Sequence, residues 1–165
     1  MNRRDIVIGF VILAALAGFI YFRAKRETPQ ELTVPQTLST EDALEEKFGL
    51  TLPENVDRAE LKDISGGDGS GIATRKFENG TFIHTVLADL PDLATGTFYE
   101  GWLVRGKQGD SNFSYISTGR MRVAKGGYLL EFTSQTNYSD YSNVVITSEK
   151  QADTTPETHI LEGSF

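Results

Sequence analysis

The chain contains no cysteine among its 165 residues. This absence excludes disulfide bonds, thiolate metal sites, a cysteine nucleophile and lipid attachment to a lipobox cysteine. Basic residues are also few, because 16 lysines and arginines stand against 23 acidic residues and leave a formal net charge of −7. We therefore expect no nucleic-acid partner, since neutralising phosphates requires a basic face. Hydrophobic residues make up 39% of the chain, which suits one ordered domain with appendages.

Histidine is scarce as well, with only His84 and His159. We expect no zinc or copper site from these two histidines. Ser111 follows Gly109-Asp110, but Asn112 stands where a nucleophile motif would have glycine, so we interpret the segment as a turn. The glycine-rich segment 66–71 lacks the Lys-Ser/Thr pair of a phosphate-binding loop, and the aspartates of the expected turns lack calcium-loop spacing. The sequence predicts no enzyme, no metal site and no cofactor.

The longest apolar run is Ile6–Phe22, which contains no charge, proline or amide. As a helix it would extend about 25 Å, close to the lower limit for crossing a membrane. Basic residues on both sides can reach the lipid headgroups: Arg3, Arg4, Arg23, Lys25 and Arg26. Ala15-Leu16-Ala17 resembles a signal-peptide cleavage site, but large apolar residues continue beyond it. We therefore expect a retained transmembrane helix over residues 6–22, with cleavage as the alternative.

The charge distribution indicates the orientation of this anchor. Residues 27–165 carry 11 basic and 22 acidic residues, whereas residues 1–26 have a net charge of +4. A cysteine-free, acidic region behind an N-terminal anchor is typical of an exported domain. We expect residues 1–5 in the cytoplasm, a single pass through the plasma membrane, and the rest of the chain outside.

Residues 23–54 are predicted to form a linker that holds one short helix over residues 40–48. Ser39 or Thr40 can cap this helix and Gly49 can end it. Leu44 and Phe48 lie four residues apart and form one apolar stripe. The stripe could dock a partner, but we favour packing of the helix against the following domain.

From residue 55 to residue 165 the pattern is that of β-strands. Asn79-Gly80 is a strong hairpin signal, because type I′ turns require positive φ. Short strands at regular spacing predict an all-β domain, an antiparallel, immunoglobulin-like β-sandwich. Trp102, the only tryptophan, is expected to fill the core between the sheets. The expected strands are Arg58–Ile64, Ala73–Glu78, Thr81–Leu90, Phe98–Arg105, Phe113–Ser117, a segment near Gly119–Ala124, Tyr128–Ser134, Asn143–Glu149 and His159–Leu161.

The segment Ser134–Asn143, with sequence SQTNYSDYSN, places Tyr138 and Tyr141 among small polar residues. Loops of this composition recur in binding surfaces, because tyrosine offers a large contact area at a low entropy cost. Tyr138 and Tyr141 are therefore the candidate partner-binding residues. In the alternative, one tyrosine closes the edge of the sandwich and the other is incidental.

Three sequence blocks resemble the extracytoplasmic domain of anti-sigma-K factors. They are Ala88–Pro91 with Phe98–Val104, then Ser117–Gly119, and finally Val144–Lys150 with Thr155–Glu157 and Ile160–Ser164. The resemblance spans roughly residues 56–165 and implies a domain outside the membrane with a sensing role. The cytoplasmic sigma-binding domain of that family has no counterpart in residues 1–5.

We accordingly expect a membrane-anchored sensing or binding domain, possessing a regulatory role and a protein partner in the envelope. The alternative is a structural envelope scaffold without a regulatory role.

Overall fold

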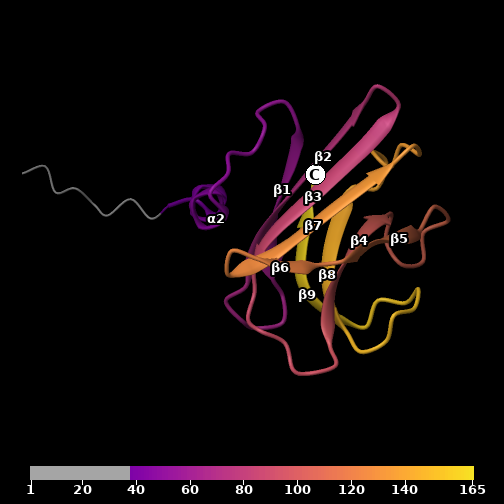
Figure 1. Cartoon of the computed structure of the whole chain (residues 1–165). Coiled ribbons are helices and arrows are strands. Elements are labelled where there is room, and N and C mark those ends of the chain that lie inside the picture. Colours follow the sequence, from indigo (N-terminus) through magenta and orange to yellow (C-terminus); the bar gives the residue numbers. More distant parts are fainter. Residues whose placement is uncertain (1–37) are drawn as a thin grey trace, which may run out of the picture. The chain divides into compact units, whose positions relative to one another are not determined.

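The computed structural model describes residues 38–165, which hold one helix and nine β-strands (Figure 1). The expectations for residues 1–5, for the apolar run Ile6–Phe22 and for the first part of the linker lie outside the described residues. Within residues 38–165, no helix combines the length and apolar character that crossing a membrane requires.

The strands follow the sequence prediction closely, with one exception. The segment near Gly119–Ala124 is divided, because one strand continues to Arg120 and a separate short strand begins at Arg122. The elements are α2 (Thr40–Phe48), β1 (Asp57–Asp63), β2 (Ser70–Glu78), β3 (Thr81–Asp89), β4 (Phe98–Arg105), β5 (Ser114–Arg120), β6 (Arg122–Ala124), β7 (Gly127–Ser134), β8 (Asn143–Glu149) and β9 (Thr158–Ser164).

The hairpin between β2 and β3 turns at the expected dipeptide. Asn79 has φ 52° and Gly80 has φ 76°, so both central residues adopt the left-handed backbone that a type I′ turn requires. The strands then pair from Glu78 opposite Thr81 along their whole length to Ser70 opposite Asp89. This part of the prediction is confirmed.

All nine strands join one antiparallel sheet in the order β5-β4-β8-β9-β1-β2-β3-β7-β6. Strands β5 and β6 stand at opposite edges of this order, yet only Met121 separates them in sequence. The backbone N–H of Met121 donates to the carbonyl oxygen of Tyr99 on β4, at 2.8 Å. The sheet therefore curls until its two edges nearly meet. This pairing confirms the antiparallel all-β class, whereas the finer immunoglobulin-like sandwich stays a prediction.

The main core fills the inside of the curled sheet. Side chains alternate between the two faces of a strand, and every second residue of β3 and β4 points inward. Gly101 lies where β4 approaches its neighbours closely, since a Cβ there would be 2.6 Å from Leu130 Cδ1 and 2.7 Å from Thr118 Oγ1. Members of this core include Leu61, Phe82, Val86, Tyr99, Leu103, Leu130, Ile146 and Leu161.

Helix α2 packs on the outer face of β2 and β3. Ser39 caps it, because its hydroxyl accepts from the Asp42 N–H at 3.1 Å, and Gly49 ends it with φ 58°. Leu44 and Phe48 are each 2% exposed and lie in a second apolar cluster with Leu52, Ile72 and Leu87. The helix thus packs against the sheet through its apolar stripe, and Leu38–Phe165 form one compact unit.

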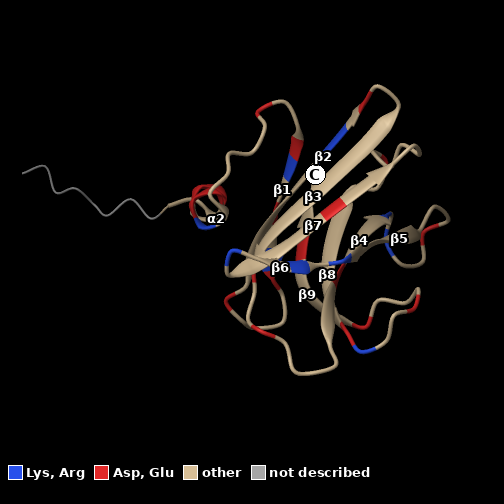
Figure 2. Cartoon of the chain, in the orientation of Figure 1, with Lys and Arg blue, Asp and Glu red and all other residues tan. Residues whose placement is uncertain are grey.

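Acidic residues occur in the helix, in the strands and in most loops of the described part of the chain (Figure 2). Several are paired locally, for example Asp89 with Lys47 at 2.6 Å and Asp57 with Arg75 at 3.1 Å. Residues 38–165 show no broad basic face in this view.

Candidate functional site

Trp102 lies on the outer face of the sheet. On β4 the residues Tyr99 and Leu103 belong to the inner core, and alternation along the strand turns Trp102 the other way. Its indole is nevertheless only 1% exposed, and Nε1–H donates to Thr147 Oγ1 at 2.8 Å. The expectation that Trp102 is a buried core residue is confirmed, but the ring lies on the outer face of the sheet rather than in the main core inside it.

These side chains enclose a groove of about 820 Å³, which we call the outer groove. Its floor comes from β4, β5, β8 and the end of the loop before β5, and its rim comes from β9, from the start of β8 and from the loops after β4 and β8. The floor consists of Trp102, Val104, Phe113, Tyr115 and Val145, and the rim includes Lys107, Gln108, Asn143, Thr155, Pro156, His159 and Glu162.

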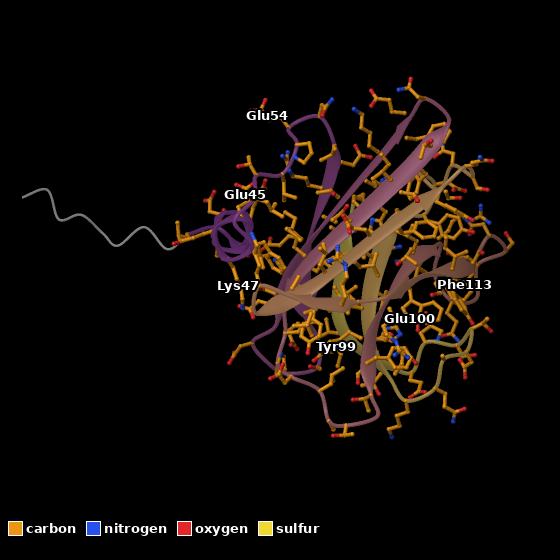
Figure 3. All side chains as sticks on the ribbon, viewed as in Figure 1. Glu45, Lys47, Glu54, Tyr99, Glu100 and Phe113 are labelled. Atoms are coloured by element: carbon orange, nitrogen blue, oxygen red, sulfur yellow. The ribbon has the colours of Figure 1, made fainter. Side chains whose placement is uncertain are left out.

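Three aromatic rings form a row in this floor. The ring centroids of Trp102 and Tyr115 are 6.0 Å apart at an interplanar angle of 73°, and those of Tyr115 and Phe113 are 5.8 Å apart at 57°. Phe113 and Tyr115 are each 37% exposed, whereas Trp102 is covered. Phe113 lies beside β5 at the edge of the molecule in Figure 3. A ligand would therefore touch the rings of Phe113 and Tyr115, with Trp102 supporting them from below.

The polar side chains of the rim are of mixed charge. Nδ1 of His159 lies 2.6 Å from Oε1 of Glu162, and both side chains are more than 40% exposed. In residues 38–165, neither histidine is hydrogen-bonded to a serine or threonine side chain, and no group of three or more histidines and acids is placed to hold a metal ion. This arrangement can bind and orient a molecule by stacking and hydrogen bonds.

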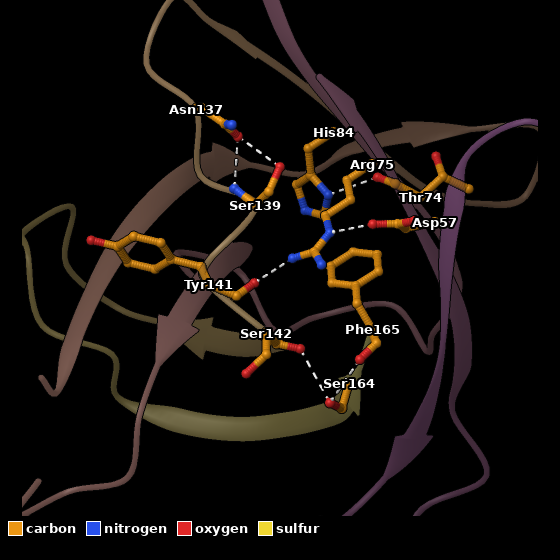
Figure 4. A network of polar contacts seen from close by, with 10 residues as sticks. All are labelled: Asp57, Thr74, Arg75, His84, Asn137, Ser139, Tyr141, Ser142, Ser164 and Phe165. Carbon is orange, nitrogen blue, oxygen red and sulfur yellow. Dashed lines mark hydrogen bonds and ion pairs between the residues drawn. The ribbon is translucent and has the colours of Figure 1, made fainter. Parts of the chain in front are cut away.

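Tyr141, one of the two candidate binding residues, is directed into the molecule. Its ring is 7% exposed and its hydroxyl is hydrogen-bonded to Ser114 Oγ at 3.0 Å. Its carbonyl oxygen accepts from Arg75 Nη1 at 2.7 Å (Figure 4), and the guanidinium of Arg105 lies 5.0 Å from the ring centroid. Ser114 is the first residue of β5 and lies between Phe113 and Tyr115, so Tyr141 braces the backbone between the two exposed rings.

Tyr138, the second candidate, is half-buried against the main core. Its ring meets Phe82 of β3 at 5.7 Å and Phe132 of β7 at 6.0 Å between centroids. The loop between β7 and β8 therefore contacts β3 and β7 through Tyr138 and β5 through Tyr141. The structure brings the two tyrosines together at 5.4 Å. Direct partner binding by this pair stays a prediction, since only Tyr138 has appreciable exposed surface.

His84 is a buried histidine on the inner face of β3. Nδ1 lies 2.9 Å from the carbonyl oxygen of Thr74, and Nε2 has no hydrogen-bond partner. Its neighbours include Phe165, whose ring is 6.2 Å away, and Arg75, which stacks on Phe165 at 4.0 Å (Figure 4). Burial, assisted by the nearby Arg75 charge, lowers the pKa of His84 to about 4. The imidazole is therefore neutral near pH 7 and belongs to the core.

The sequence analysis missed the outer groove, although part of the signal was present. Phe113 and Tyr115 are two residues apart, so a strand places both on one face. Their neighbour Trp102 comes from another strand, and its position beside Tyr115 depends on the pairing of β4 with β5. Pairing partners cannot be read from a single strand.

No protein-family model, curated protein or solved structure matches the chain. The resemblance to anti-sigma-K factors is therefore untested by these comparisons and stays a prediction.

Proposed function

We propose that the chain is a membrane-anchored binding domain that presents the outer groove to a partner outside the plasma membrane. The groove is the observation on which this proposal depends. It combines a concave shape, a volume of about 820 Å³ and two partly exposed aromatic rings, Phe113 and Tyr115. Ligand sites are commonly concave and largely apolar, with a few polar groups at the rim.

Two further features support binding at this surface. Aromatic side chains contribute large contact areas at interfaces, and binding hot spots are enriched in them. The groove is also built on a rigid support, because β4 pairs with β5 and β8, and the indole N–H of Trp102 donates to Thr147 on the neighbouring strand β8. A rigid site loses little conformational entropy when it binds.

The proposal retains the expectations drawn from the sequence. The run Ile6–Phe22 supplies the single-pass anchor, and the anti-sigma-K resemblance supports an exported, immunoglobulin-like domain with a regulatory role. Tyr138 and Tyr141 remain the proposed partner-binding residues, and Tyr141 also supports the groove through its hydrogen bond to Ser114.

Photocrosslinking in intact cells tests this proposal. The full chain carries a benzophenone amino acid in place of Tyr115, and a matched variant carries it in place of Ile83. Ile83 is 45% exposed on β3 and lies outside the outer groove, so it controls for random encounters. We expect one dominant adduct from position 115 in the membrane fraction, recognised by its mass, and no such adduct from position 83.

Absence of an adduct at position 115, or the same adducts from both positions, would contradict a binding role for the groove. A structural scaffold needs the folded domain but not the groove. If cells tolerate Tyr115→Leu without any change in envelope phenotype while loss of the domain causes one, the scaffold alternative is correct.

A further inference from the structure

We propose that the outer groove binds an uncharged saccharide chain. This inference rests on the proposed function, because it names the ligand class of the same surface. Three features of the groove lead to it: the aromatic floor, the balanced charge of the rim and the paired backbone beneath.

The aromatic floor suits the faces of sugar rings. A pyranose ring presents C–H groups on its faces and hydroxyls around its edge, so its faces pack on aromatic rings while its edge needs polar partners. Phe113 and Tyr115 expose 37% of their surface each, and their centroids are 5.8 Å apart. Two neighbouring sugar units can therefore contact one ring each. The 57° angle between the rings requires a chain that twists between the two units.

The rim offers hydrogen bonds without a dominant charge. Gln108, Asn143 and Thr155 have side chains that both donate and accept, as sugar hydroxyls require. Lys107 and Glu162 place one basic and one acidic side chain on the same rim. A phosphate or uronate would meet the carboxylate as well as the ammonium group, so neither an anion nor a cation is favoured.

The backbone beneath the groove argues against an added peptide strand. Strand addition requires an unpaired sheet edge, whereas β4 is paired with β5 and β8, and β8 is paired with β4 and β9. The edge strand β5 has a free side, but that side faces β7 where the curled sheet nearly closes. Proline-rich peptides also dock on aromatic grooves. The indole N–H of Trp102 would be the obvious donor to such a peptide, but it is buried and already donates to Thr147. A saccharide that uses ring faces and rim side chains fits better.

Fluorescence titration of the full chain tests the ligand class. Trp102 is the only tryptophan in the sequence and contacts Tyr115, so its emission reports occupancy of the groove. The protein is held in lauryldimethylamine oxide, because detergents with sugar headgroups would compete. The probes are maltoheptaose, cellohexaose and chitohexaose, with oligogalacturonate as the anionic comparison and a decaproline peptide as the peptide comparison. We expect a saturable change with at least one neutral oligosaccharide and weaker binding of both comparison probes.

Substitutions at Tyr115 separate stacking from general packing. Tyr115→Leu keeps apolar contact but removes the flat ring, so affinity should fall about tenfold, equivalent to about 1.4 kcal/mol. Tyr115→Phe keeps the ring and should bind within about threefold of the original chain. Ile83→Leu is the matched control on β3 and should not change affinity. Far-ultraviolet circular dichroism of each variant verifies the fold.

The outcomes distinguish this inference from the proposed function. If no neutral oligosaccharide binds, or if oligogalacturonate or decaproline binds more tightly, the saccharide assignment is overturned. Crosslinking at position 115 in cells would then still show a binding groove with another ligand. Equal affinities of the Tyr115→Leu variant and the original chain would also overturn the assignment, because binding would not involve the ring.

Discussion

The imidazole of His84 has no exposed surface and an Nε2 atom without a partner. Water cannot hydrate the charged imidazolium inside the core, so burial disfavours the charged form. This lowers the pKa of His84 from the ordinary value of 6.5 to about 4. The groups that face it are Thr74 and Arg75 from β2, Phe82 from its own strand and Phe165 at the end of the chain. No acidic side chain is among these groups to stabilise the charged form.

We therefore expect the free energy of unfolding to fall as the pH drops from 6.5 to 4. In this window the unfolded chain binds a proton at His84 that the folded chain does not, so protonation favours unfolding. The full loss is about 3 kcal/mol by linkage from the two pKa values. Urea unfolding at pH 7, 5.5 and 4.5 measures it, and His84→Gln should flatten the slope between these points. An unchanged slope in that variant would show that other groups cause the effect.

The hydroxyl of Tyr141 also contributes to the stability of the fold, through its hydrogen bond to Ser114. Tyr141→Phe removes its hydrogen bond to Ser114 and should lower the free energy of unfolding by about 1 kcal/mol. Tyr141→Ala removes a buried ring and should cost about 3–5 kcal/mol. Urea titrations of the two variants compare these effects. Full stability of Tyr141→Ala together with lost partner capture would instead show that the ring binds a partner directly.

At the scale of elements, the stability of helix α2 depends on its contact with the sheet. A helix of nine residues is only marginally stable alone in water, so burial of Leu44 and Phe48 supplies most of its stability. The cap at Ser39 and the turn at Gly49 determine where it begins and ends.

Phe48→Ala should therefore destabilise the folded unit by about 3–5 kcal/mol, because it removes a buried ring between α2, Ile72 and Leu87. Ser39→Ala removes only the cap and should cost about 1 kcal/mol. Thermal unfolding of both variants, with hydrogen exchange of the α2 amides, compares the two contributions. A Phe48→Ala variant as stable as the original chain would mean that α2 is free to dock elsewhere.

At the scale of the whole molecule, the curled sheet places the outer groove and α2 on different strands. The groove is built on β4, β5, β8 and β9, whereas α2 covers β2 and β3. An occupant of the groove therefore need not displace the helix that leads towards the N-terminal part of the chain.

The predicted anchor implies that residues 38–165 are outside the membrane. Protease added to intact spheroplasts should digest this unit and leave a membrane-embedded peptide that contains Ile6–Phe22. Immunoblots with tags at either end of the chain measure the two fragments. Protection of the C-terminal tag until the spheroplasts are lysed would reverse the orientation, and a mature N-terminus at Gly18 would indicate cleavage.

Local patterns in the sequence determined the class of fold and most element boundaries. The Asn79-Gly80 turn and the ends of helix α2 depend on positive φ values and caps within a few residues, which a linear sequence reveals. Alternation along β4 likewise shows that Tyr99 and Leu103 share one face and that Trp102 faces the opposite way.

Only the tertiary structure decided which face is inside and which strands are neighbours. The segment near Gly119–Ala124 divides at Met121 because the chain there passes from β4 to β7 as its pairing partner, a change that no local signal contains. Tyr141 is buried because Ser114 and Arg105, distant in sequence, approach its ring. The outer groove exists for the same reason, since β4, β5 and β8 bring Trp102, Tyr115 and Val145 together only after the sheet has formed.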